Sequence, residues 1–261
     1  MRTIAVSGKG GTGKTTISAF IVRWLNMNVT KSILAVDADP NVNLNEVLDV
    51  DIPSTIGSIR EEMRASVSDL PGGMTKQQFL EYKIQTSLRE TPDFDLLAMG
   101  RPEGPGCYCY ANNLLRDILA ALSRNYDFVV IDNEAGMEHL SRRTTQVIDD
   151  LLIVSDPSVR GIRAAGKISR LLHELETRVR ARYLILNRCP DILPMEVAAA
   201  AEDTGLALLG TVPEDPVLLE MDRSGRPLWP AGRETRAFLA LNRWLSGLME
   251  SENWREAKHG L

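Results

Sequence analysis

The chain has 261 residues, of which 44% are hydrophobic and 25% charged, a composition that can bury a sizeable core. Its formal net charge of −5 disfavours broad nucleic-acid binding, and no apolar run approaches the roughly 20 residues of a membrane span. Three cysteines are too few for a disulfide framework, and the first strand begins too close to Met1 for a signal peptide. We therefore expect a cytoplasmic protein with no membrane or nucleic-acid partner.

Short apolar runs alternate with longer amphipathic stretches, which is typical of a mostly parallel sheet flanked by helices on both faces. We expect strands at Arg2–Ser7, Ser32–Asp37, Phe94–Met99, Phe128–Asp132, Leu151–Val154, Tyr183–Asn187 and Leu206–Thr211. Helices are expected at Lys14–Asn26, Asn113–Ser123, Arg160–Val179, Met195–Asp203 and Glu234–Met249. The polar segment Asp51–Pro92 is expected to be a helical or mobile excursion. The pattern predicts a single α/β domain over residues 1–261, with a sheet of about seven or eight strands.

A glycine-rich segment joins the first expected strand to the first expected helix. Glycines let consecutive backbone N–H groups approach an anion, and the helix that follows adds its positive N-terminal end. This order of elements is the context that a phosphate-binding loop needs, so we expect a P-loop NTPase. Lys14 would contact the β- and γ-phosphates, and the Thr15 hydroxyl would bind Mg²⁺. The candidate nucleotide-binding residues here are Gly8, Lys9, Gly10, Gly11, Thr12, Gly13, Lys14, Thr15 and Thr16.

A second lysine, Lys9, follows the first glycine of this loop. The loop thereby resembles the deviant Walker A loop of the MinD/ParA ATPases and the nitrogenase iron proteins. The resemblance implies that Lys9 reaches across a homodimer interface to the nucleotide of the partner, where its charge would act as an arginine finger does. The alternative is that Lys9 only adds positive charge in its own subunit. Lys9 and Lys14 are therefore candidate catalytic residues, and ATP is expected to promote a homodimer.

Carboxylates stand at the ends of two expected strands, at the edge where open α/β sheets bind ligands. Asp37 and Asp39 follow the run Ile33–Val36, and Asp132 ends the run Phe128–Ile131. In the resembling families these positions form switch I and the Walker B strand, with switch II directly after it. We assign Asp39 to the catalytic water and both Asp37 and Asp132 to Mg²⁺. The reverse assignment of Asp37 and Asp39 stays open, as does a capping role for Asp37.

The base of the nucleotide is expected to meet two later segments. Asn187 ends a strand, and relatives in the resembling families read adenine with an asparagine there. Pro213, Glu214 and Asp215 resemble the loop that closes over the base. Two ordinary turns are the alternative, and ATP as the nucleotide rests on the resemblance alone.

Cys107 and Cys109 stand two residues apart, after a Gly-Pro-Gly segment and before an expected helix. An irregular loop can aim both thiols at one surface, and the helix N-terminus beyond would favour the thiolate form that binds metals. Two sulfurs do not satisfy a zinc or nickel ion, which usually takes about four ligands. A two-fold dimer doubles the pair, so we expect a metal site between two subunits.

Five segments carry a closer likeness: Gly8–Thr16, Asp37–Pro40, Arg101–Cys109, Asn133–His139 and Val212–Pro216. They resemble the CooC family, the ATPases that mature nickel-containing carbon monoxide dehydrogenase, and the similar AcsF proteins of acetyl-CoA synthase. The resemblance implies that Cys107 and Cys109 of two subunits hold Ni²⁺, or Zn²⁺ in competition. ATP would drive dimer formation, and hydrolysis would release nickel to the apo-enzyme. Cys189 is expected to be a structural thiol.

Two other functions stay open. An iron–sulfur cluster carrier generally shows Cys-x-x-Cys or well separated cysteines, unlike the pair here. A positioning ATPase of the MinD/ParA kind needs a basic DNA-binding face or an amphipathic C-terminal helix. The tail Ser251–Lys258 is mixed in charge and only weakly amphipathic.

Overall fold

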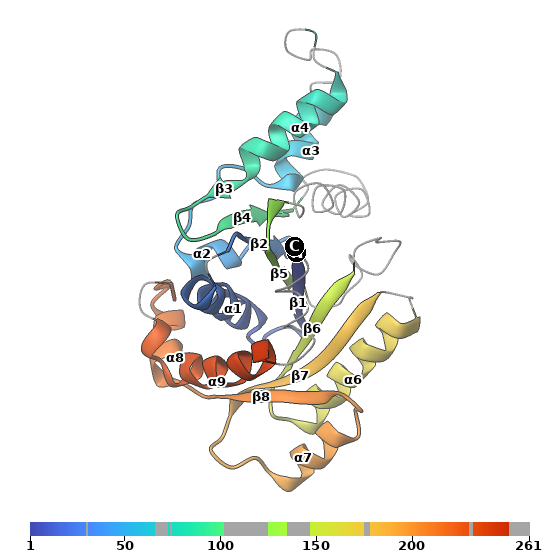
Figure 1. Cartoon of the computed structure of the whole chain (residues 1–261), viewed down its shortest axis with the longest axis vertical. Helices are drawn as coiled ribbons and strands as arrows, with labels where there is room; N and C mark the ends of the chain where they lie inside the picture. Colours follow the sequence, from blue (N-terminus) through green and yellow to red (C-terminus); the bar gives the residue numbers. More distant parts are fainter. Residues whose placement is uncertain are drawn as a thin grey trace.

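An eight-stranded sheet forms the centre of the computed structural model, which describes residues 1–29, 31–65, 73, 75–101, 125–134, 147–174, 178–229 and 232–250 (Figure 1). The strands run in the order β3-β4-β2-β5-β1-β6-β7-β8, and only the β3–β4 pair is antiparallel. Their bounds are β1 Arg2–Gly8, β2 Ile33–Ala38, β3 Arg89–Glu90, β4 Asp95–Ala98, β5 Phe128–Asn133, β6 Ile148–Ser155, β7 Val179–Cys189 and β8 Ala207–Pro213. The central strands β1, β2, β5 and β6 are buried along their whole length, which explains why they read as continuous apolar runs.

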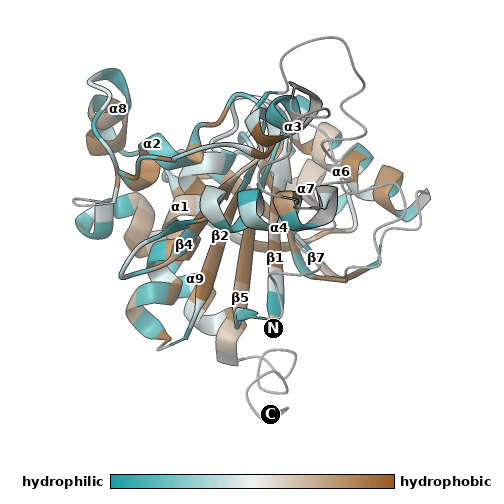
Figure 2. Ribbon diagram, turned by 90° about the horizontal axis from the view of Figure 1, so that it is seen from above, coloured by the Kyte–Doolittle hydropathy of each residue, from teal (hydrophilic) through white to brown (hydrophobic). Residues whose placement is uncertain are grey.

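Helices cover the two faces of this sheet. The helices in the described part of the chain are α1 Lys14–Asn28, α2 Leu44–Leu48, α3 Ile56–Ala65, α4 Lys76–Ser87, α6 Val159–Glu174, α7 Met195–Glu202, α8 Pro216–Arg223 and α9 Arg236–Glu250, with a 3₁₀ turn at Gly232–Glu234. On one face, Phe20 of α1 meets Phe238 of α9 edge-to-face, with ring centroids 5.4 Å apart. On the other, Ile162 of α6 and Val197 of α7 join the second buried cluster. Figure 2 shows the strands in hydrophobic colours between these layers.

Helices α3 and α4 project from the sheet as a pair (Figure 1). They pack against each other, and Lys83 of α4 forms an ion pair with Glu62 of α3. Thr75 and Gln78 form a reciprocal capping box at the start of α4, which fixes where that helix begins. The excursion predicted over Asp51–Pro92 is therefore largely helical in its described part.

The predicted fold class is confirmed, with seven strands where the sequence placed them. The helix predicted over Arg160–Val179 was too long, because α6 ends at Glu174 and Val179 opens β7 beside Ile148. Glu234 lies in the 3₁₀ turn, and α9 starts after Thr235, whose Oγ1 accepts from the N–H of Phe238 at 3.2 Å. Elements α2, α8 and β3 were not predicted, and the helix expected at 113–123 lies outside the described residues. The single domain over residues 1–261 stays a prediction.

No described helix combines the length and the hydropathy that a bilayer crossing requires.

Candidate nucleotide-binding site

The turn between β1 and α1 needs glycine at two of its positions. A Cβ on Gly8 would lie 2.2 Å from the carbonyl oxygen of Val154 on the neighbouring strand β6. Gly13 has a φ of +89°, and a Cβ there would lie 2.3 Å from Nδ2 of Asn187. Any larger residue at these positions would push the loop away from the strands that support it.

The two lysines of this loop occupy different environments. Lys14 is only 9% exposed, and its Nζ lies 3.5 Å from the carbonyl oxygen of Lys9, to which it donates. Thr12 Oγ1 donates to the same oxygen at 2.9 Å and so closes the turn. The side chain of Lys9 stands exposed on the rim. The side chain of Lys14 therefore lies inside the loop, whereas that of Lys9 is accessible to solvent and to other molecules.

Asp132 and Asp37 lie opposite each other at the ends of β5 and β2, directly below the loop. Ser18 Oγ donates to Asp132 Oδ1 at 3.1 Å, and the Thr15 hydroxyl also donates to this carboxyl. Burial raises the pKa of Asp132 to about 7, and the charge of Asp37 adds to the shift, whereas the hydrogen bond from Thr15 opposes it. Buried carboxylates beside a hydroxyl and an ammonium are the oxygen-rich surroundings that a hard divalent cation such as Mg²⁺ requires. The residues present fit Mg²⁺.

Asp37 also organises the loop that follows β2. Its Oδ1 accepts from the N–H of Asp39 at 3.0 Å, and its Oδ2 accepts from the N–H groups of Asn43 and Leu44 at 2.8 Å each. Burial raises the pKa of the Asp37 carboxyl, while these three backbone bonds oppose the shift. Asp39 is half-buried, and its Oδ1 accepts from the backbone and side chain of Asn41. The capping role left open for Asp37 is thus real, alongside any part it takes in metal binding.

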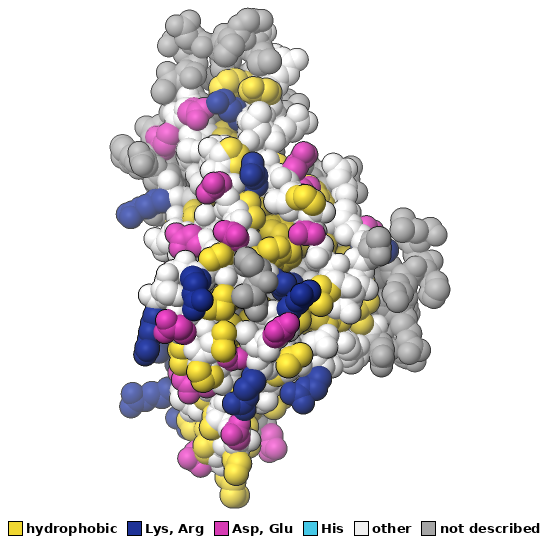
Figure 3. Space-filling model, turned by 90° about the vertical axis from the view of Figure 1, so that its left-hand side faces the viewer, with side chains coloured by type: hydrophobic (Ala, Val, Ile, Leu, Met, Phe, Trp, Pro, Cys, Tyr) yellow, Lys and Arg dark blue, Asp and Glu magenta, His cyan; other side chains and the backbone are white. Residues whose placement is uncertain are grey.

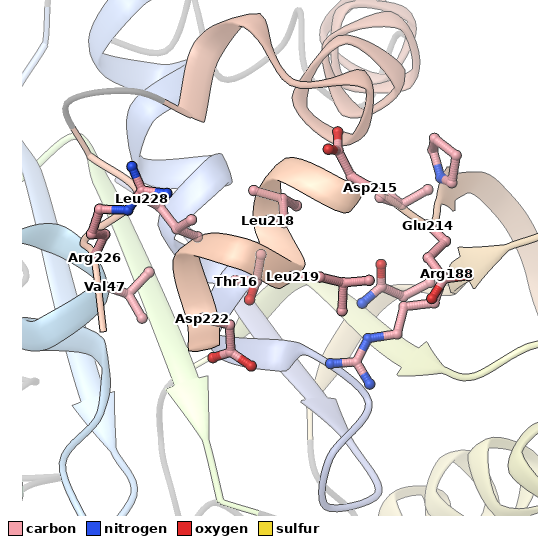
Figure 4. Close-up of a pocket in the computed structure, with 13 residues that line it drawn as sticks. Thr16, Val47, Arg188, Glu214, Asp215, Leu218, Leu219, Asp222, Arg226 and Leu228 are labelled. Atoms are coloured by element: carbon pink, nitrogen blue, oxygen red, sulfur yellow. The ribbon is translucent and has the colours of Figure 1, made fainter. Parts of the chain in front are cut away.

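A cavity of about 110 Å³ opens beside the loop and brings together residues from α1, α2, the end of β7 and the segment 212–228 (Figure 4). Asn187, Pro213, Glu214 and Asp215, all predicted from the sequence, line it together with Thr16 of α1. Its other lining residues are Val47, Arg188, Val212, Leu218, Leu219, Asp222, Arg226 and Leu228. Asn187 is 6% exposed and donates from Nδ2 to the carbonyl oxygen of Thr12 at 2.8 Å, so this cavity is joined directly to the phosphate-binding loop.

Comparisons with known proteins agree with this arrangement. Residues 1–185 match the family model described as an AAA domain, which is more than half of the chain. The chain belongs to this AAA domain family. An uncharacterized ATP-binding protein of Methanocaldococcus jannaschii is 46% identical over 228 residues, covering 87% of this chain and 90% of that one. The carbon monoxide dehydrogenase accessory protein CooC of Rhodospirillum rubrum is 30% identical over 242 residues, covering 85% and 87%.

Solved structures give the same fold. The septum site-determining protein MinD of Pyrococcus horikoshii, solved with Mg-ADP, aligns with a TM-score of 0.67 at 24% identity and covers 95% of this chain and 96% of that one. MinD in the MinC:MinD complex of Aquifex aeolicus aligns with a TM-score of 0.69 at 22% identity and 97% coverage of both chains. The chain therefore has the P-loop NTPase fold of these MinD structures.

Sequence reasoning missed much of the wall of this cavity. Leu218, Leu219 and Asp222 come from α8, which begins at Pro216 after the N-cap Asp215. Aspartate before proline is a helix-start signal, whereas the sequence analysis assigned this segment to the loop over the base. Arg188 adopts left-handed backbone with a φ of +57°, and because the residue is not glycine, no signal in the sequence predicted it.

The carboxylate of Asp215 accepts hydrogen bonds from the first turns of two helices. It is 4% exposed, its Oδ1 accepts from the N–H of Val217 at 2.9 Å, and its Oδ2 accepts from the N–H of Ala237 at 3.1 Å. The first bond caps α8 and the second joins the first turn of α9. Asp215 therefore lines the cavity while its side chain fixes two helix starts.

The predicted metal ligands Cys107 and Cys109 lie outside the described residues, as do residues 135–138 of the predicted switch II, Asn133–Glu138. Within the described ranges, no group of three or more His, Cys, Asp or Glu side chains is arranged to hold a metal ion. Cys189 is buried, its Sγ donates to the carbonyl oxygen of Leu186 at 3.4 Å, and burial raises its thiol pKa to about 11. A thiol held in its neutral form suits the structural role expected for Cys189.

Proposed function

We propose that this MinD/ParA-type ATPase is a nickel chaperone, which binds Ni²⁺ between two subunits and delivers it to apo carbon monoxide dehydrogenase or acetyl-CoA synthase in the cytoplasm. The observation that carries the proposal is the Cys107-x-Cys109 pair in a chain whose P-loop has a second lysine, Lys9. Two such pairs supply four thiolates across a dimer, and Zn²⁺ would compete for the same ligands. The 30% identity to CooC of Rhodospirillum rubrum supports this cargo.

Each residue around the phosphates of ATP has one role in this proposed function. Lys14 binds the phosphates from inside the loop, and the exposed Lys9 reaches the nucleotide of the partner subunit. Thr15, Asp37 and Asp132 would hold Mg²⁺, which neutralises phosphate charge and polarises the γ-phosphoryl group. Asp39 orients the water that attacks this group, giving ADP and phosphate.

The adenine base would occupy the cavity beside the loop. Asn187 already donates its Nδ2 to Thr12, which leaves its Oδ1 as an acceptor for the exocyclic amine of adenine. Pro213 and Glu214 would close over the ring, and Asp215 would act by fixing the starts of α8 and α9.

Nickel binding under anaerobic conditions tests the proposal. Equilibrium dialysis would be run with and without a non-hydrolysable ATP analogue, with the molecular mass read by light scattering. We expect about one nickel per dimer, because four thiolates complete one coordination sphere. The double variant Cys107→Ala/Cys109→Ala should lose this nickel, while the matched control Cys189→Ala keeps it. Nickel binding that ignores the double substitution, or no nickel in any nucleotide state, would contradict the proposal.

A positioning role is the second candidate, favoured by the 25% identity to MinD of Bacillus subtilis over 253 residues. On the face in Figure 3, Lys and Arg side chains alternate with Asp and Glu and form no continuous basic surface. Pelleting with anionic vesicles or with DNA, in ATP and in ADP, separates this role from the chaperone. A brown colour with a charge-transfer band after anaerobic purification would instead indicate an iron–sulfur cluster carrier.

A further inference from the structure

The end of β7 sends two consecutive side chains to the same loop. Asn187 Nδ2 donates to the carbonyl oxygen of Thr12 at 2.8 Å, and Arg188 Nη1 donates to that of Gly11 at 3.2 Å. In a regular strand these neighbours would point to opposite faces. Here the pairing of β7 with β8 shifts register between Asn187 and Cys189, and Arg188 turns into the left-handed region with φ +57°. The irregularity re-aims the arginine at the loop, as bulges beside active sites do.

The backbone of Arg188 is strained, and its surroundings offer little packing to hold it. Left-handed backbone is unfavourable for a residue with a Cβ, and among the described non-glycine residues only Val42, Asp49 and Arg188 adopt it. Arg188 is exposed, so burial does not hold this conformation. Strain of this kind persists where a specific contact depends on it. For Arg188, this contact is the hydrogen bond from its guanidinium to the carbonyl oxygen of Gly11.

These two bonds orient the peptide groups of the phosphate-binding loop. In a trans peptide the carbonyl oxygen and the following N–H point to opposite sides. Holding the carbonyls of Gly11 and Thr12 toward β7 therefore turns the N–H groups of Thr12 and Gly13 away from it. Gly11 itself is exposed, with no atom within 4 Å of where its Cβ would be, so its outer side has little other support.

We infer that Arg188 is a positioning residue for ATP hydrolysis. Its guanidinium holds the Gly11 carbonyl and, with Asn187, fixes the direction of the consecutive N–H groups that receive the ATP phosphates. The inference rests on the ATPase activity and is independent of the nickel cargo.

The variant that tests this is Arg188→Gly, because glycine adopts left-handed backbone freely. We expect its melting temperature to equal or exceed that of the parent, while kcat/KM for ATP falls about tenfold or more, as when oriented donors at an active site are lost. The affinity for adenosine, read by ligand-observed NMR, should fall much less than the affinity for ATP, because adenosine has no phosphates, although Arg188 also lines the cavity. Millimolar guanidinium should restore part of the lost activity in Arg188→Gly and have no such effect on the parent.

Asp49→Gly is the matched control. Asp49 has a φ of +59°, is exposed and is the C-cap residue of α2. This variant should gain similar stability and keep ATP turnover within about twofold of the parent, as a distant surface change does. The inference is overturned if Arg188→Gly keeps full kcat/KM, or if its adenosine affinity falls as much as its ATP affinity, which would mean a direct contact with the nucleoside. A lowered melting temperature that accounts for the lost activity would also overturn it.

Discussion

Asp132 is the residue whose ionisation the fold opposes most plainly at the nucleotide site. Burial raises its pKa from 3.8 to about 7, so between these values the unfolded chain is ionised and the folded chain is protonated. The free energy of unfolding of the nucleotide-free protein should therefore be highest below about pH 4, as far as this group is concerned, and fall as the pH rises through about 7. Binding of Mg²⁺ needs the carboxylate and should strengthen over the same interval.

Urea denaturation between pH 5 and pH 8, without Mg²⁺ or nucleotide, measures this dependence at about four pH values. Asp132→Asn removes one titrating group, so its stability should vary less with pH than that of the parent. Some slope should survive, because the pKa of Asp37 is raised as well. Identical slopes for the two proteins would show that Asp132 does not titrate in this range.

Gly13 allows a second prediction at the residue scale. Gly13→Ala places a Cβ 2.3 Å from Nδ2 of Asn187 at a φ of +89°, and should both lose ATP binding and destabilise the fold by about 1 kcal/mol or more. Gly225→Ala is the control, since Gly225 also has positive φ but no atom lies within 4 Å of its Cβ position. It should show the loss of stability without the loss of ATP affinity in calorimetry. Equal ATP affinity in both variants would refute the role of close approach at Gly13.

Between elements, the carboxylate of Asp215 is the clearest single link. It caps α8 through Val217 and holds the first turn of α9 through Ala237. Asp215→Ala removes both bonds, and at about 1 kcal/mol for each cap the free energy of unfolding should fall by about 2 kcal/mol. Glu220→Ala, at an exposed acid of the same helix, should change it by less than about 0.5 kcal/mol. A loss from Asp215→Ala no larger than that of the control would rule out the double cap.

The sequence predicted best the elements that are buried on both faces, because burial gives them a continuous apolar composition. Strands such as β1 and β5 are apolar runs because helices cover both their faces. Strand β3 is two charged residues, which carry no such signal. The end of α6 was missed because no glycine or proline lies between Glu174 and Val179, so the break depends on the pairing of β7 with β6.

The candidate site divides in the same way. Local patterns predicted the phosphate-binding loop and the residues that meet at the cavity, Asn187 and Pro213 among them. Arg188 was not predicted, because its left-handed backbone results from a register shift between two strands. The second role of Asp215 also depends on tertiary structure, since Ala237 is 22 residues away along the chain.

At the scale of the whole molecule, the exposure of Lys9 predicts complementation between two inactive variants. If Lys9 serves the nucleotide of the partner, Lys9→Ala and Asp39→Ala should each abolish ATP hydrolysis alone. A mixed dimer then holds one complete site, made of Lys9 from one subunit and Asp39 from the other. An equal mixture should recover up to roughly a quarter of the parent activity, because half of the dimers are mixed and each has one working site.

Steady-state phosphate release at several mixing ratios measures this recovery. Doubling the concentration of either variant alone is the control and should recover no ATP hydrolysis. A mixture that stays inactive would place Lys9 in its own subunit, the alternative that the sequence left open.

The position of β1 in the sheet sets the order in which this protein can assemble during synthesis. Strand β1 is translated well before its partners, which are Phe128–Asp132 on one side and Asp150–Val154 on the other. More than roughly 100 residues must be translated before either edge of β1 is paired, which at ribosomal speeds takes several seconds. During that interval the apolar strand β1, which is buried in the folded protein, is exposed in the nascent chain. The phosphate-binding loop that follows it still lacks the neighbouring strands β5 and β6. The phosphate-binding loop is therefore translated well before Asn187 and Asp215, which complete the candidate nucleotide site.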